Sequence, residues 1–128
     1  MKTERTIHIL DRDVRLRYCA ATENGFEQLR KKSIYQIDFH SHEDMIALSL
    51  AAIIAAYARS EEEAPINSDD LLYDAAPQDI ITLMTATIEL RNEWYNVPKV
   101  VEDTIKAEQT DTVPSGSSAG ESTDEEKN

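Results

Sequence analysis

The stretch MIALSLAAIIAAYA, Met45–Ala58, decides how the rest of this chain must fold, because none of its fourteen residues is charged. Its Ala, Leu, Ile and Met residues favour an α-helix. At about 100° per residue its apolar side chains point in every direction, so no side is left for water. The stretch is shorter than the roughly 20 apolar residues that cross a bilayer. We therefore predict a central helix, from about His42 to about Ser60, that either is covered on every side or has one face free for a partner. We expect the other elements of so short a chain to leave part of it uncovered.

The composition limits the functions that this chain can have. Of its 128 residues, 41% are hydrophobic and 30% are charged, which suits one domain with its own core. The net charge of −12 argues against binding to nucleic acid phosphates or to an anionic membrane. The single cysteine, Cys19, cannot form an internal disulfide and indicates a reducing compartment. The first residues contain no apolar run typical of a signal peptide, so we expect a cytoplasmic protein.

Two short strands are predicted ahead of the central helix, at Thr6–Leu10 and Val14–Tyr18, because apolar and polar residues alternate in both. The polar residues Asp11–Asp13 between them indicate a turn. A lone hairpin is only marginally stable in water, so it must pack on a helix. The apolar face that would cover one side of the central helix consists of Ile7, Ile9, Val14, Leu16 and Tyr18.

A short helix is expected between the hairpin and the central helix, with Thr22 as its N-cap and with the apolar residues Phe26 and Leu29 three positions apart. Gly25 inside this helix lowers helix stability by about 1 kcal/mol relative to alanine. It therefore either weakens the prediction of a helix here or marks a close contact of the backbone. Residues 33–40 are predicted to form an irregular or partly helical link. Ser41 then suits the N-cap of the central helix.

The second half of the chain is predicted to contain one short and one long helix. Ser68 would cap the short helix, Asp69–Asp74. Its inward side chains would be Leu71, Leu72 and Tyr73. Pro77 would begin the long helix, which runs to about Asn96 with a broad apolar arc.

The end of the chain changes in composition. Lys99–Glu108 could hold a weak helix, and from Gln109 onward the residues are mostly Ser, Thr, Gly and acids, which predicts disorder. We therefore expect an α+β, mostly α-helical fold. An N-terminal β-hairpin packs on a small helical bundle within residues 1–108, and residues 109–128 form a disordered acidic C-terminal tail.

Nothing in the sequence predicts catalysis. His40 and His42 lie near acidic residues, as in some metal sites, but no second motif completes a ligand shell and a helix start explains the acids. Cys19 has no paired base that would make it a nucleophile. The neighbouring acids from Asp69 to Asp79 suit capping and solvation better than acid–base chemistry. We predict no catalytic residue, no cofactor and no metal site, so the protein is not expected to be an enzyme.

Arg91 is unexpected, because it lies near the middle of the apolar arc of the last helix. Either its stem is buried while its charge reaches water, or it pairs with a partner or with a buried acid. Trp94 and Tyr95 could belong to the core or to an interface, where aromatic residues and arginine are enriched. The residues that we predict for partner binding are Leu50, Ile54, Tyr57, Arg91, Trp94 and Tyr95.

The order of these elements resembles a known family. The run VRLRYCAATENGFEQLRKKSI, Val14–Ile34, the Ala-rich helix and the later LRNEWYNVPK resemble the tail assembly chaperones of long-tailed bacteriophages with non-contractile tails. The likeness covers roughly Thr6 to Lys99 and rests on pattern and element order. The family has no invariant site that could be carried over to residues of this chain.

The resemblance implies a function in virion assembly. Such chaperones act in the cytoplasm of the bacterial host and are absent from the mature virion. They coat the tape measure protein, a long and largely helical ruler, and keep it soluble. A longer form, often made by translational frameshifting, is thought to recruit tail tube subunits. The acidity of this chain would help to keep such a complex soluble.

A different class of function fits the same composition. An acidic adaptor or inhibitor in the cytoplasm would bind a basic partner through charge, and salt would weaken that binding strongly. A chaperone that binds through apolar surfaces would keep its affinity in salt. Self-association is compatible with either function.

Overall fold

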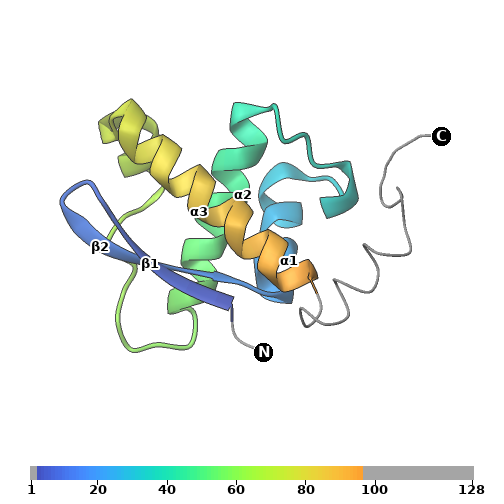
Figure 1. Ribbon diagram of the computed structural model, residues 1–128, viewed down its shortest axis with the longest axis horizontal. Coiled ribbons are helices and arrows are strands. Elements are labelled where there is room, and N and C mark those ends of the chain that lie inside the picture. The colour runs from blue at the N-terminus through green and yellow to red at the C-terminus, as the bar shows by residue number, and fades with distance from the viewer. Residues whose placement is uncertain (1–2, 97–128) are drawn as a thin grey trace, which may run out of the picture. The chain divides into compact units, whose positions relative to one another are not determined.

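The computed structural model describes residues 3–96, and the weak helix and the acidic tail predicted after Lys99 lie outside them. The elements, in order, are β1 (Thr3–Ile9), β2 (Arg12–Tyr18), α1 (Ala20–Arg30), η1 (Ile34–Gln36), α2 (His42–Tyr57), η2 (Asp70–Asp74) and α3 (Pro77–Tyr95) (Figure 1). This confirms the mostly helical α+β fold with an N-terminal hairpin. Within residues 3–96, no helix is long and apolar enough to cross a membrane.

The hairpin is antiparallel and tighter than predicted. Ile7 lies opposite Val14 and Thr3 lies opposite Tyr18. The turn consists of Leu10 and Asp11, whose φ angles of 54° and 59° are left-handed. The prediction of a turn over Asp11–Asp13 was wrong, because a two-residue turn of this kind matches the twist of the strands and lets both strands extend further.

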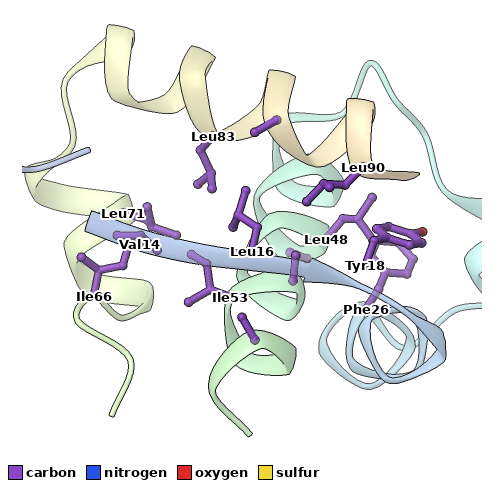
Figure 2. Close-up of a cluster of buried hydrophobic side chains, with 14 of the residues drawn as sticks. Val14, Leu16, Tyr18, Phe26, Leu48, Ile53, Ile66, Leu71, Leu83 and Leu90 are labelled. Atoms are coloured by element: carbon purple, nitrogen blue, oxygen red, sulfur yellow. The ribbon is translucent and has the colours of Figure 1, made fainter. Parts of the chain in front are cut away.

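α2 is the centre of the fold, as the sequence predicts. Strand β2, helix α1 and helix α3 all pack on it, and α3 also lies along β1 (Figure 1). Figure 2 shows the core that results, in which side chains from the hairpin and three helices meet. The labelled side chains that are almost completely buried are Val14, Leu16, Tyr18, Phe26, Leu48, Ile53, Leu83 and Leu90.

The cover over α2 is more complete than the sequence suggests. From Met45 to Tyr57 every residue is buried except Leu50, which is half-buried, and Ile54, which is 52% exposed. Both polar groups of this stretch find partners. Ser49 contacts the Thr87 hydroxyl at 3.0 Å, and the Tyr57 hydroxyl accepts a hydrogen bond from the Arg15 backbone at 3.1 Å. The expectation that part of this helix stays uncovered therefore holds only for the narrow face of Leu50 and Ile54.

Helix α1 begins earlier than predicted. Its N-cap is Cys19, and Thr22 lies in the first turn, where it is fully buried. The Thr22 hydroxyl donates to the Arg17 carbonyl at 2.6 Å and accepts from the Cys19 backbone at 3.2 Å. The prediction of Thr22 as N-cap was wrong, because this hydroxyl joins the end of β2 directly to the first turn of the helix.

The short helix η2 also differs from the prediction in the side chains that it turns toward the core. Leu71 is buried as predicted, but Leu72 and Tyr73 are 56% and 80% exposed, so the prediction that they turn inward was wrong. A single turn directs neighbouring side chains to different sides, and only one of these side chains reaches the core. Its start is fixed by reciprocal hydrogen bonds between Asn67 and Asp70 rather than by Ser68.

Candidate partner-binding surfaces

A mostly apolar concavity runs beside α3. This α3 groove lies between α3 and the segment that enters α2, and its volume is about 650 Å³. Its apolar wall consists of Phe39, Met45, Met84 and Ile88, and Glu89 and Arg91 contribute the charges at its edge. An elongated, mostly apolar surface of this kind suits the apolar face of a partner helix.

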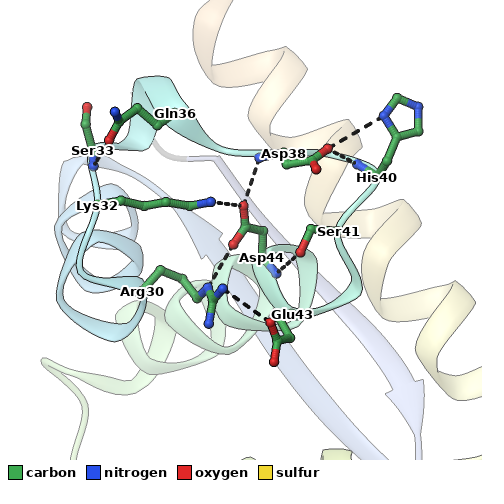
Figure 3. A network of polar contacts seen from close by, with 9 residues as sticks. All are labelled: Arg30, Lys32, Ser33, Gln36, Asp38, His40, Ser41, Glu43 and Asp44. Carbon is green, nitrogen blue, oxygen red and sulfur yellow. Dashed lines mark hydrogen bonds and ion pairs between the residues drawn. The ribbon is translucent and has the colours of Figure 1, made fainter.

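A buried carboxylate holds the wall of the α3 groove in place (Figure 3). Asp44 is fully buried, and its oxygens accept hydrogen bonds from Arg30 at 2.8 Å and from the Asp38 backbone at 2.9 Å. Lys32 lies 2.7 Å from the same carboxylate. The Asp44 backbone in turn donates to Ser41 at 3.1 Å, which confirms Ser41 as the N-cap. Because Asp38 directly precedes Phe39, this network fixes the chain at the edge of the groove.

The ionisation of Asp44 depends on these donors. Burial alone would raise the pKa of Asp44, but the hydrogen bonds from Lys32, the Asp38 backbone and Arg30 outweigh it and lower the pKa to about 2. The carboxylate is therefore charged near neutral pH, and it joins the end of α1 to the start of α2.

Arg91 lies at one end of the α3 groove with its guanidinium between two aromatic rings. The guanidinium carbon is 4.8 Å from the centre of the Phe39 ring and 4.7 Å from that of Tyr95. Such cation–π contacts hold the planar group in one orientation. Its Nε atom is buried and has no hydrogen-bond acceptor within residues 3–96. Arg91 thus neither extends freely into water nor forms an ion pair with a described residue.

The aromatic residues at the end of α3 close the core next to Arg91. Trp94 is half-buried, and its ring centre lies 5.6 Å from that of Tyr18 and 5.0 Å from that of Tyr95. The Tyr18 hydroxyl donates to Glu23 at 2.9 Å, and the Tyr95 hydroxyl donates to the same carboxylate. Burial and the nearby Glu23 raise the pKa of both tyrosines. Trp94 is therefore mainly a packing residue, whereas Tyr95, 43% exposed, also reaches the surface.

A second apolar surface lies on the one uncovered face of α2. Leu50 and Ile54 are one helical turn apart on this face. Leu50 lines a smaller groove of about 250 Å³, together with Leu29 of α1 and Leu72 of η2. Ile54 is nine positions from Met45 in sequence, so it points to about the opposite side of α2 from the α3 groove.

The six residues predicted for partner binding are therefore not brought together. Leu50 and Ile54 lie on the free face of α2, and Arg91, Trp94 and Tyr95 gather at the end of the α3 groove. Tyr57 belongs to neither surface, because its ring is buried under the Arg15 guanidinium at 4.4 Å.

Sequence reasoning missed the residues that form the wall of the α3 groove. The sequence predicts a broad apolar arc on the last helix and an irregular link over residues 33–40, but it does not single out Phe39, Met84 or Ile88 as surface residues. A periodic apolar pattern marks the side of a helix that avoids water, but it does not tell a filled core from an open groove.

The acidic residues next to His40 and His42 make structural contacts. The Asp44 carboxylate is paired with Arg30 and Lys32. The Asp38 carboxylate accepts a hydrogen bond from the His40 backbone at 2.9 Å. In the part of the chain that the structure describes, no group of three or more His, Cys, Asp or Glu side chains is placed to hold a metal ion. Cys19 is half-buried and lies at the start of α1.

Comparisons of the chain with protein-family models, with curated proteins and with solved structures found no match.

Proposed function

We propose that this protein is a phage tail assembly chaperone that binds the tape measure protein and keeps it soluble during tail assembly. The observation that carries this proposal is the α3 groove, an open and mostly apolar surface beside α3. Its wall of Phe39, Met45, Met84 and Ile88 suits the apolar face of an amphipathic helix, the element from which a long helical ruler is built.

The side chains of the groove also suit a partner with many different binding segments. Met45 and Met84 come from two helices and meet in the same wall. Methionine is unbranched and polarizable, so it adapts to apolar side chains of different shape. A protein that coats a long ruler must bind successive helical segments that differ in sequence, and a wall of this kind tolerates such variation.

The charge of the chain supports the same function. The net charge is −12, and the groove itself is mostly apolar. Apolar contacts would hold the partner, while the excess of acidic groups elsewhere on the chain would keep the complex soluble.

The proposal predicts a long, helix-rich reading frame directly downstream of the gene for this chain, and the test is co-expression of the full chain with the product of that reading frame. We expect the downstream protein to be insoluble alone and soluble together with this chain. Ile88→Glu places a charge in the groove wall and should reduce the soluble fraction severalfold. Ile81→Glu is the matched control, because Ile81 lies on the same helix, is 56% exposed and is not part of the α3 groove. Circular dichroism should show both variants folded.

Three results would contradict this function. The downstream protein could stay insoluble with and without this chain, or Ile81→Glu could have the same effect as Ile88→Glu. A complex that dissociates at about 0.5 M salt would instead favour an acidic adaptor that binds a basic partner through charge.

A further inference from the structure

We infer that the α3 groove selects a partner helix that carries an aspartate or glutamate one turn beyond its apolar contact residues, and that this carboxylate binds Arg91. The inference rests on the proposed function and names the chemistry of the segment that the groove binds.

The first reason is that Arg91 is the unpaired charge at this groove. Arg5, Arg12, Arg15 and Arg30 each lie within ion-pair distance of a carboxylate. For Arg91, as for Arg17 of β2, no carboxylate of residues 3–96 lies that close and the buried Nε has no acceptor there, but of these two only Arg91 lines the groove. Glu89 lines the same groove, but it is bound to Arg5. The groove therefore presents a positive charge that its own wall does not neutralise.

The second reason is that the guanidinium is held ready for a ligand. The Phe39 and Tyr95 rings contact the Arg91 guanidinium at 4.8 and 4.7 Å. A guanidinium stacked on aromatic rings keeps the donors at its edge for a planar acceptor, and a carboxylate is the side chain that matches this geometry. Because the side chain is already ordered, little conformational entropy remains to be lost on binding.

The spacing along α3 defines the segment that fits. Met84, Ile88 and Arg91 follow one another at intervals of four and three residues, so they lie on one face of the helix. This face is about 10 Å long. A partner helix along it would place two apolar residues, three or four apart, against Met84 and Ile88. Its carboxylate would follow one turn later, opposite Arg91.

The experiment measures binding of the full chain to overlapping peptides of about 20 residues that cover the downstream helical protein, by fluorescence anisotropy. The best binders should carry the pattern of two apolar residues and an acid. Replacing that acid by its amide in the peptide should weaken binding to the wild type about tenfold. Against Arg91→Gln the same replacement should change affinity by less than about twofold, because the partner charge is already missing.

Further variants separate charge, geometry and folding. Arg91→Lys keeps the charge but loses the planar donor edge, so it should recover only part of the affinity. Arg59→Gln is the matched control, because Arg59 is exposed just after α2 and does not line the groove. It should bind both peptides as the wild type does. Circular dichroism verifies that each variant is folded.

The outcomes distinguish this inference from the proposed function. If peptides bind and Ile88→Glu weakens them, but the amide replacement has no effect, the Arg91 inference is overturned while the chaperone function stands. If Arg91→Gln responds to the amide replacement as strongly as the wild type, the pairing is equally overturned. If no peptide binds and the downstream protein stays insoluble, the proposed function is overturned and the inference with it.

Discussion

Gly25 of α1 lies directly against Ala51 of α2, so close that a Cβ atom at position 25 would come within 3.1 Å of the Ala51 side chain. The absence of a side chain at position 25 lets the two helices approach closely at this point. It also explains a glycine inside a helix, where the residue costs about 1 kcal/mol relative to alanine. The close contact that the sequence suggested for Gly25 is confirmed.

The Gly25–Ala51 contact predicts a coupling between the two positions. Gly25→Ala alone should change the free energy of unfolding little, because the gain in helix propensity is offset by crowding against Ala51. In an Ala51→Gly background the same replacement should stabilise by about 1 kcal/mol. Urea denaturation of the four proteins measures this coupling. Equal effects in both backgrounds would show that the helices are not in close contact here.

The Asp44 network predicts a specific loss of stability in acid. In the folded protein the pKa of Asp44 is about 2, below the ordinary value of 3.8. The stabilisation that comes from the ionised Asp44 carboxylate is therefore fully present above about pH 4. That contribution, about 2 kcal/mol, should disappear as the pH falls from 4 to 2. Asp44→Asn should therefore be less stable than the wild type near neutral pH, and the difference should shrink through this range.

A neighbouring acid provides the control for Asp44. Glu43 lies 3.4 Å from Arg30, but its side chain is 77% exposed. Glu43→Gln should change the free energy of unfolding by less than about 0.5 kcal/mol at neutral pH, because exposed ion pairs contribute little. If it destabilises as much as Asp44→Asn, burial is not what makes the Asp44 contacts important.

From the buried Tyr18 hydroxyl we predict a second pH dependence of the folding stability, at alkaline pH. Burial and its hydrogen bond to Glu23 raise the pKa of Tyr18 above its ordinary value of 10. The folded protein then keeps a proton that the unfolded chain releases, so stability should fall as the pH rises above about 10, by up to about 1.4 kcal/mol per pH unit. Urea midpoints against pH should fall less steeply for Tyr18→Phe. Equal slopes would contradict the burial of this hydroxyl.

Two adjacent isoleucines test the narrow free face of α2. Ile53 is completely buried, whereas Ile54 is 52% exposed. Ile53→Ala should lower the free energy of unfolding by about 2–5 kcal/mol, and Ile54→Ala by less than about 1 kcal/mol. Thermal denaturation of the two variants measures the difference. Similar losses would show that α2 is rotated from the orientation described.

Much of this fold could be predicted from local residue patterns. An uncharged run such as Met45–Ala58 must be buried wherever it lies, so it predicts the central helix without knowledge of its neighbours. Three other signals also depend on only a few neighbouring residues. They are the alternation of apolar and polar residues in the hairpin, the N-cap Ser41 of α2 and Pro77 at the start of α3. Their effect is therefore visible in the sequence itself.

Only the tertiary structure decided which apolar residues remain at the surface. Phe39, Met45, Met84 and Ile88 form one wall because α3 packs on α2, and this depends on contacts between residues distant in sequence. Other contacts between distant segments bury Tyr57 under Arg15 and place Arg91 beside the Phe39 and Tyr95 rings, whereas none of them covers Leu72. Side-chain chemistry determines that a residue avoids water, but the neighbours that exclude water are fixed only when distant segments meet.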